Sequence, residues 1–256
     1  QEKQHRLESA LKDVALHIDE GDNRNVIMKK RLTYFVLFFI LGANAQEIEL
    51  KHTFNVEIGL PNGTSNKPFA SIMQGLVNVN PYYQYTLKNG IAFGAGFRYA
   101  YFGVNQFRVP QKTLGGMHSF GIFGKLGHEK FYTERFSGDF GVKVGYTENY
   151  FNTDRNKNLF QNPYQVNSVL IEPTAEFGLL ADEQISYSFV VSYAFQGFSF
   201  KSNMIGLETF GGFDPSEFEK VTSYLTVGFG FTYYFKRKRR KVQDAPDVLN
   251  PGIENA

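Results

Sequence analysis

The residues that could support catalysis are few, and their spacing does not suit it. A nucleophile and its base on one strand must lie two residues apart, because alternate side chains point to the same face. None of His52, His118 and His128 has Ser or Thr two residues away, and the adjacent His118 and Ser119 should point to opposite faces. We therefore expect no catalytic site, and a dyad assembled across strands is the alternative that stays open.

The sequence predicts no metal or cofactor site either. The chain contains no Cys, so thiolate metal sites, thiol nucleophiles and disulfides do not arise. Asp214, Glu217 and Glu219 could bind a hard cation, but their spacing matches no known loop motif, and a solvated acidic loop is the preferred interpretation. The run Gly94-Ala95-Gly96 lacks the further Gly and the following helix of a dinucleotide-binding motif.

Seven charged residues share a face with Gly, Ser and Thr in segments of alternating character. Three are basic and four acidic: Glu57, Arg98, Lys125, Asp139, Lys143, Glu172 and Glu176. Inside a narrow barrel an unpaired charge costs several kcal/mol, so these groups should pair with one another. We expect a polar interior filled by salt bridges, and the alternative is a narrow channel lined by the same residues.

The elements that position these charges are eight predicted β-strands. The last strand, Val221–Phe235, alternates large apolar residues with small ones over its whole length. A tilted strand needs roughly 9–11 residues to cross a bilayer, with apolar side chains toward lipid. The other seven strands are expected at residues 52–60, 76–88, 91–104, 117–126, 136–150, 165–181 and 185–200, with a bulge or kink at Pro173.

The predicted connections alternate in length. Those after the first, third, fifth and seventh strands are long and polar, and cover residues 61–75, 105–116, 152–164 and 201–220. The connections between them are shorter and cover residues 88–90, 127–135 and 182–184. This pattern predicts an all-β, antiparallel, up-and-down transmembrane barrel with external loops and periplasmic termini. Residues 69–79 could hold a further strand segment, which leaves ten strands as an alternative.

A soluble barrel with its apolar face inward is the competing architecture. In that arrangement Phe and Tyr side chains from eight strands would point into the interior and overfill it, whereas Gly and Thr leave an interior that side chains can fill. The sequence therefore favours the membrane barrel.

The N-terminal region carries the three parts of a secretory signal peptide. A basic run at residues 28–31 precedes a short apolar run at residues 32–41, and Ala43 and Ala45 form a cleavage motif before Gln46. A single-pass anchor is the alternative. We expect residues 1–27 to be an upstream segment absent from the mature protein, 28–45 the signal peptide, 46–235 the barrel and 236–256 a basic, disordered periplasmic tail.

Together these features resemble the small outer-membrane β-barrel family of Gram-negative bacteria, which includes OmpX-like and OmpA-like eight-stranded barrels. The resemblance rests on the signal that ends in Ala43-Asn44-Ala45, the alternating strands over 52–235 and the aromatic end Thr232-Tyr233-Tyr234-Phe235. In that family such an end is read by the barrel-assembly machinery, which the resemblance implies as a partner during biogenesis. This chain differs by continuing past Phe235.

Two further groups of side chains are expected to contact the membrane. Aromatic residues near strand ends should form interfacial girdles: Tyr101, Tyr146, Tyr150, Phe195, Tyr233 and Phe235. The basic cluster after the last strand should attract anionic headgroups, and its alternative is a solvated tail: Lys236, Arg237, Lys238, Arg239, Arg240 and Lys241. The net charge of +2 gives no general case for nucleic-acid binding.

The sequence thus predicts a non-enzymatic integral outer-membrane protein with four extracellular loops that contact an unidentified partner. A narrow pore for ions or small solutes and a lipid-modifying enzyme are the two alternatives, because the family that the chain resembles contains passive barrels, adhesins, pores and enzymes.

Overall fold

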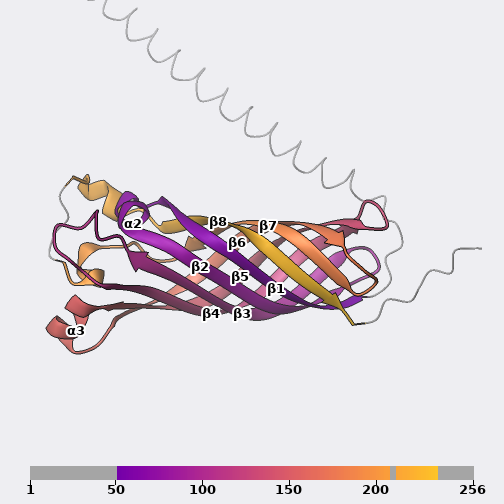
Figure 1. Ribbon diagram of the computed structural model, residues 1–256, viewed down its shortest axis with the longest axis horizontal. Coiled ribbons are helices and arrows are strands. Elements are labelled where there is room, and N and C mark those ends of the chain that lie inside the picture. The colour runs from indigo at the N-terminus through magenta and orange to yellow at the C-terminus, as the bar shows by residue number, and fades with distance from the viewer. Residues whose placement is uncertain (1–50, 208–211, 236–256) are drawn as a thin grey trace, which may run out of the picture. The chain divides into compact units, whose positions relative to one another are not determined.

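The computed structural model describes residues 51–207 and 212–235, which form one closed barrel (Figure 1). Each strand pairs antiparallel with its neighbours in sequence, and β1 pairs with β8. The expected eight-stranded up-and-down barrel is confirmed. Its strands are β1 (Lys51–Ser65), β2 (Met73–Thr86), β3 (Ile91–Val104), β4 (Gly115–Phe131), β5 (Phe136–Thr153), β6 (Tyr164–Leu180), β7 (Ile185–Gln196) and β8 (Thr222–Tyr234).

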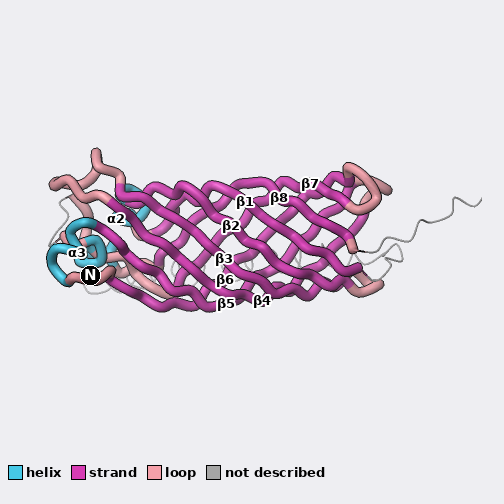
Figure 2. The backbone as a smooth tube through the Cα atoms, turned by 60° about the horizontal axis from the view of Figure 1, so that its bottom comes forward, coloured by secondary structure: helices cyan, strands magenta, loops and turns pink. Residues whose placement is uncertain are grey.

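The two ends of the barrel differ. The turn end carries the short connections 87–90, 132–135 and 181–184, and the loop end carries the connections 66–72, 105–114, 154–163 and 197–221. Thr53 of β1 pairs with Tyr234 of β8, so the first strand begins and the last strand ends at the turn end. Figure 2 shows the helical segments gathered at the loop end.

Side chains alternate between the two surfaces of the barrel, as the pleat of a strand requires. Outside, the exposed fraction reaches 74% for Phe229 and 68% for Phe97, and inside it is 0% for Lys143 and Glu172. The barrel therefore buries its charges and exposes its large apolar side chains.

Within the described residues, four short helices lie in the loop-end connections. They are α2 (Lys67–Ile72), α3 (Asp154–Phe160), η1 (Ser202–Ile205) and η2 (Pro215–Phe218). The Asn66 side chain accepts a hydrogen bond from the Phe69 N–H at 3.1 Å, and Thr153 accepts one from the Asn156 N–H at 3.2 Å, so α2 and α3 each begin with a side-chain cap. None of the helices in the described ranges has the length and apolar character needed to cross a membrane.

The long loops are not polar throughout, which corrects the sequence prediction. An apolar core closes the loop end, and its loop residues are Phe69, Ile72, Phe198, Phe200, Met204, Ile205 and Leu207. They pack against inward side chains of the strands, among them Phe102, Met117 and Phe151. Burying them removes apolar surface from water at the one place where the loops can reach each other.

Several predicted strand boundaries are wrong. Residues 67–72 form α2 and residues 73–79 begin β2, so the ten-stranded alternative is wrong. β7 ends at Gln196 instead of residue 200, because Phe198 and Phe200 leave the sheet to join the loop-end core. β1 extends to Ser65 and β4 runs to Phe131, both beyond their predicted ends.

Pro173 produces no bulge. Its pairing with Val142 of β5 is continuous with the neighbouring pairs, and the register toward β7 is the same before and after it. The pairs toward β7 pass from Ile171–Phe195 directly to Thr174–Ser192. The hydrogen-bond ladder between β6 and β7 is interrupted beside Pro173 because proline has no N–H to donate. The register between the two strands does not change there.

A close approach of β1 to β8 gives a prediction about closure. Gly59 and Gly228 face each other across this seam, and a Cβ added at Gly228 would overlap the Ile58 carbonyl oxygen. We expect Gly228→Ala to destabilise the folded barrel by about 1–3 kcal/mol, the usual range for overpacking. The urea midpoint of the refolded protein measures this change.

Gly124→Ala is the matched control. A Cβ at Gly124 would have the Gly94 carbonyl oxygen as its nearest neighbour, at 3.9 Å, which is ordinary contact. Equal urea midpoints for the two variants would contradict the proposed crowding at the seam.

Candidate functional site

The charged residues of the lumen form two connected groups. The group nearer the turn end is organised by Lys125 of β4. Its ammonium lies 3.1 Å from Asp139 Oδ2 and 2.9 Å from Glu176 Oε1, and donates to the Tyr82 hydroxyl at 3.0 Å. The Tyr82 hydroxyl in turn donates to Glu176 Oε1 at 2.8 Å. Lys125 thus holds together side chains from β2, β5 and β6.

The group nearer the loop end contains two ion pairs. Arg98 contacts Glu172 and donates to the Tyr224 hydroxyl at 2.8 Å. Lys143 contacts Glu57 and lies 3.9 Å from Glu172 Oε1, so Glu172 faces both cations. All four charged side chains are buried. Buried charges are tolerated when they are paired, and each of these four has an oppositely charged partner. In the described residues Glu57 Oε1, Arg98 Nε and Glu172 Oε1 nevertheless have no hydrogen-bond partner.

Aromatic rings lie beside the three cations of the lumen. The Lys125 ammonium lies 4.7 Å from the centre of the Tyr82 ring, and Lys143 lies 5.3 Å from the same ring. Arg98 lies 5.5 Å from the centre of the Tyr224 ring. These distances suit cation–π contacts, which are stronger in a desolvated interior.

Sequence reasoning missed one lumen carboxylate, Glu129. It accepts hydrogen bonds from Thr86 Oγ1 at 2.7 Å and from the Tyr234 hydroxyl at 3.1 Å, and no ion pair is among its contacts in the described part of the chain. The predicted fourth strand ended before it. Glu129 is an even number of residues from Lys125, so the two side chains point to the same face of the strand. This spacing could have identified Glu129 from the sequence.

The structure thus places all seven predicted lumen charges inside the barrel and adds an eighth. Asp139 is only partly buried, whereas the other seven lie deep in the interior. At the turn end the same network borders a polar cavity of about 20 Å³, lined by Gln84, Glu129 and Asp139 among others. A cavity of this volume holds roughly one water molecule.

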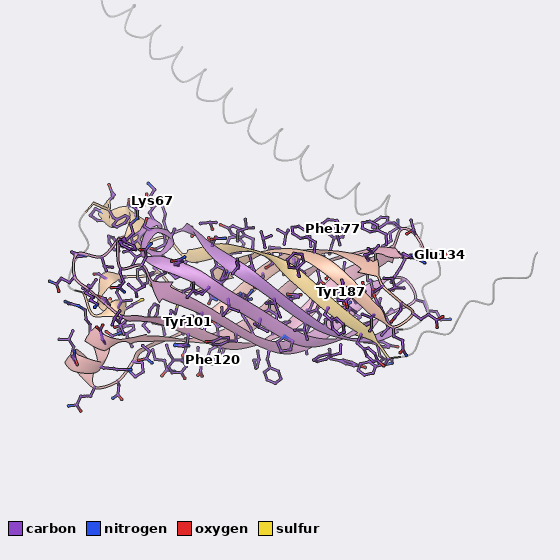
Figure 3. All side chains as sticks on the ribbon, in the orientation of Figure 1. Lys67, Tyr101, Phe120, Glu134, Phe177 and Tyr187 are labelled. Atoms are coloured by element: carbon purple, nitrogen blue, oxygen red, sulfur yellow. The ribbon has the colours of Figure 1, made fainter. Side chains whose placement is uncertain are left out.

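The aromatic residues predicted as girdles all lie on the outer surface. Tyr101, Tyr150 and Phe195 lie near the loop end, and Tyr233 and Phe235 lie at the turn end. Figure 3 shows Tyr101 and Phe120 toward the loop end, and Phe177 and Tyr187 nearer the turn that carries Glu134.

Tyr146 is placed differently from the sequence expectation. It pairs with Ile122 and Val169, which are both exposed and apolar, because β5 continues well beyond it to Thr153. It therefore lies within the apolar surface and not near a strand end.

The residues considered for chemistry in the sequence are not brought together. The His118 ring contacts the Tyr99 hydroxyl at 3.0 Å on the outer surface, whereas Ser119 is fully buried on the inner one. In the last loop, Glu217 lies 3.1 Å from both Lys67 and Lys220, and these hydrogen bonds lower the pKa of its carboxyl group below the ordinary value. Hydrogen bonds from Ser216 likewise lower the pKa of Asp214.

Several predicted features lie outside the described residues. These are the upstream segment 1–27, the signal peptide with Ala43, Ala45 and Gln46, and the basic cluster at 236–241. They stay predictions.

No family model matches the chain, and a search of curated proteins finds no relative. Among solved structures, the chain is similar to Neisserial surface protein A, with 10% identity and a TM-score of 0.48 over 71% of this chain and 96% of that one. It is also similar to Ail, the attachment invasion locus protein of Yersinia pestis, with 10% identity and a TM-score of 0.44 over 73% of this chain and 100% of that one.

A third similar structure is the N-terminal β-barrel domain of Pseudomonas aeruginosa OprF. Its identity is 10% and its TM-score 0.39, over 72% of this chain and 99% of that domain. All three are small outer-membrane barrels, the family that the sequence resembles. At these identities and TM-scores the likeness does not extend to a ligand or an activity.

The contacts of Lys125 give a testable prediction. Lys125→Met leaves the carboxylates of Asp139 and Glu176 without their cation, and breaking a buried pair in this way costs about 3–5 kcal/mol. We expect a large fall in the urea midpoint. Lys88→Met, which removes an exposed cation from a turn, should leave the midpoint unchanged.

The double variant Lys125→Met/Glu176→Gln separates lost charge pairing from lost packing. It should recover part of the stability that the single variant loses, because one uncompensated carboxylate is removed. A double variant that is no more stable than Lys125→Met would contradict the ion-pair account.

Proposed function

We propose that the chain is a non-enzymatic integral outer-membrane protein that keeps its lumen closed and offers its loop end to partners outside the cell. The observation that carries this proposal is the inverted burial of the barrel. Lys125, Lys143 and Glu172 are buried inside, while the outer surface carries exposed residues such as Phe97 and Phe229.

An apolar outer surface is unfavourable in water and favourable in the hydrocarbon of a bilayer. A soluble protein rarely exposes a continuous apolar area of more than a few hundred Å², yet the exposed apolar residues here come from all eight strands. In a bilayer the same residues face lipid, and the closed sheet presents no open strand edge to it. These facts support insertion in a membrane. The signal peptide predicted from the sequence and the barrel fold together favour the outer membrane.

The filled interior favours a closed barrel over the pore alternative. Arg98 contacts both Glu172 and Tyr224 across the lumen, and the apolar loop-end core lies beyond them. An ion on this path would have to break buried ion pairs and then cross apolar side chains, both of which carry large desolvation costs. The separation of His118 from Ser119 gives no support to the lipid-modifying alternative.

One part of the loop end is suited to contact with a partner. Phe107 is 97% exposed, and Leu114 and Leu159 are also exposed. The exposed cations Arg108, Lys112 and Lys157 lie in the same two connections. We define this loop patch as residues 105–114 and 154–159. Its combination of apolar and basic side chains suits a partner that presents acidic groups beside apolar ones.

The loop patch is held in place by contacts between its two segments. Arg155 donates a hydrogen bond to Gln111, and the Leu114 N–H donates to Asp154 Oδ1 at 3.0 Å. The connection 105–114 is thereby fixed against α3. A surface ordered before binding loses less conformational entropy when a partner binds.

Cell-surface labelling tests this proposal. We expect an epitope tag inserted after Arg108 to be labelled by antibody on intact cells, because that residue lies in an external loop. The same tag inserted after Lys88, in a turn at the opposite end, should be labelled only after the outer membrane is permeabilised. Heat-modifiable gel mobility shows that each variant has folded.

The reverse labelling pattern would contradict the proposed orientation. Equal labelling of both variants on intact cells, or of neither variant after permeabilisation, would contradict location in the outer membrane.

A further inference from the structure

The charges of the lumen do not balance along the barrel. Near the loop end, Arg98 and Lys143 face Glu57 and Glu172, so two cations meet two carboxylates. Near the turn end, Lys125 is the one cation that pairs with a lumen carboxylate in the described ranges, and it faces Asp139 and Glu176 while Glu129 lies beyond them. With all three carboxylates ionised, one cation faces three anions near the turn end, an excess of two negative charges.

This excess is concentrated around one cavity, which we call the turn-end chamber. Its wall contains all three of these carboxylates, Glu129, Asp139 and Glu176, together with Gln84 and Ser188. Its volume of about 20 Å³ accepts one particle the size of a water molecule. A larger solute does not fit.

Residues that line the turn-end chamber carry buried oxygen atoms without hydrogen-bond partners, and these atoms indicate what kind of ligand the chamber would bind. Gln84 Oε1, Asp139 Oδ1 and Ser188 Oγ have no hydrogen-bond partner in the described part of the chain. The exposed fraction is only 3% for Gln84 and 7% for Ser188. Leaving a buried oxygen without a partner costs about 1–3 kcal/mol, so these atoms call for a ligand that oxygen can coordinate.

The orientation of the Gln84 amide is fixed by its other end. Gln84 Nε2 donates to Asp139 Oδ2 at 2.8 Å, and Lys125 contacts the same carboxylate oxygen. Rotating the amide would place its oxygen against a carboxylate oxygen. Gln84 Oε1 and Asp139 Oδ1 therefore both stay available on the wall of the chamber.

We propose that the turn-end chamber binds a single monovalent metal cation, Na⁺ or K⁺, through these oxygen atoms and the carboxylate of Glu129. Oxygen ligands suit hard cations, and one such ion cancels half of the local negative excess. No group of three or more His, Cys, Asp or Glu in the described ranges has the arrangement of a metal site. The proposed site therefore depends on the neutral oxygens of Gln84 and Ser188 and is not formed by carboxylates alone.

Stability in different salts tests the proposal on the full chain. Urea midpoints of the refolded protein are compared in NaCl, KCl and choline chloride at equal ionic strength, because choline is too large for the chamber. A ligand that binds only the folded state stabilises it in proportion to the logarithm of its concentration. The midpoint should therefore be higher in NaCl or KCl than in choline chloride, and should rise with the logarithm of the metal-ion concentration.

Two variants locate the effect. Glu129→Gln should abolish the difference between metal and choline salts, and Ser188→Ala, which removes an oxygen without changing charge, should reduce it. Glu148→Gln is the matched control, because it removes a carboxylate that hydrogen-bonds Tyr150 away from the chamber, and should keep the full difference. Heat-modifiable mobility shows which variants fold.

Crystals of the protein soaked in Tl⁺, a heavy monovalent substitute for K⁺, should show an anomalous peak within the chamber. Equal midpoints in all three salts would overturn the proposal. So would a difference that survives in both Glu129→Gln and Ser188→Ala, because the ion would then bind elsewhere. Stability that depends on pH but not on the cation would mean that protons neutralise the chamber.

Discussion

The pairing of β1 with β8 is the interaction on which the rest of the structure depends. It turns an open sheet into a closed barrel and leaves no edge strand whose N–H and C=O groups lack partners. Closure requires the two strands to approach closely, which is why Gly59 faces Gly228 at this seam. It also creates a narrow interior, which side chains from all eight strands must fill.

The interior is isolated from solvent, so the charged side chains inside it must pair with one another. Lys125, Lys143 and Arg98 can be buried because each meets a carboxylate from a distant part of the chain. These pairs link β3 to β6, β4 to β6 and β5 to β1 across the lumen, so they connect strands that the sheet itself does not pair. The apolar core of the loops seals one end, and the small polar cavity lies at the other. The protein thus separates a closed, charged interior from an apolar outer surface and an ordered loop end.

Alternation along the sequence was enough to predict the strand number, the inward residues and the alternating connections, because the direction of a side chain in a strand is a local property. Features set by distant contacts were not predictable in this way. Phe198 and Phe200 fall on the inward, even-numbered positions, where β7 carries Ser and Gln, and they leave the sheet because Phe69 and Phe151 lie beside them in the folded chain. Glu129 was missed because the alternation of apolar and small residues in β4 weakens toward the turn. Tyr146 was predicted to lie near a strand end because the predicted strand ended at residue 150, whereas β5 continues to Thr153. The excess of carboxylates near the turn end became evident only when the ion pairs were known.

The central claim is that the outer surface of the barrel faces lipid and the inner surface does not. Quenching of Trp fluorescence by brominated lipids tests this claim most directly. The chain has no Trp, so each single Trp variant reports on one position. In bilayers with brominated acyl chains, we expect strong quenching for Phe97→Trp and Phe229→Trp, which lie on the outer surface. Weak quenching is expected for inward Phe123→Trp and for Phe107→Trp in the loop patch. Outer positions that are quenched no more than Phe107→Trp would contradict the account.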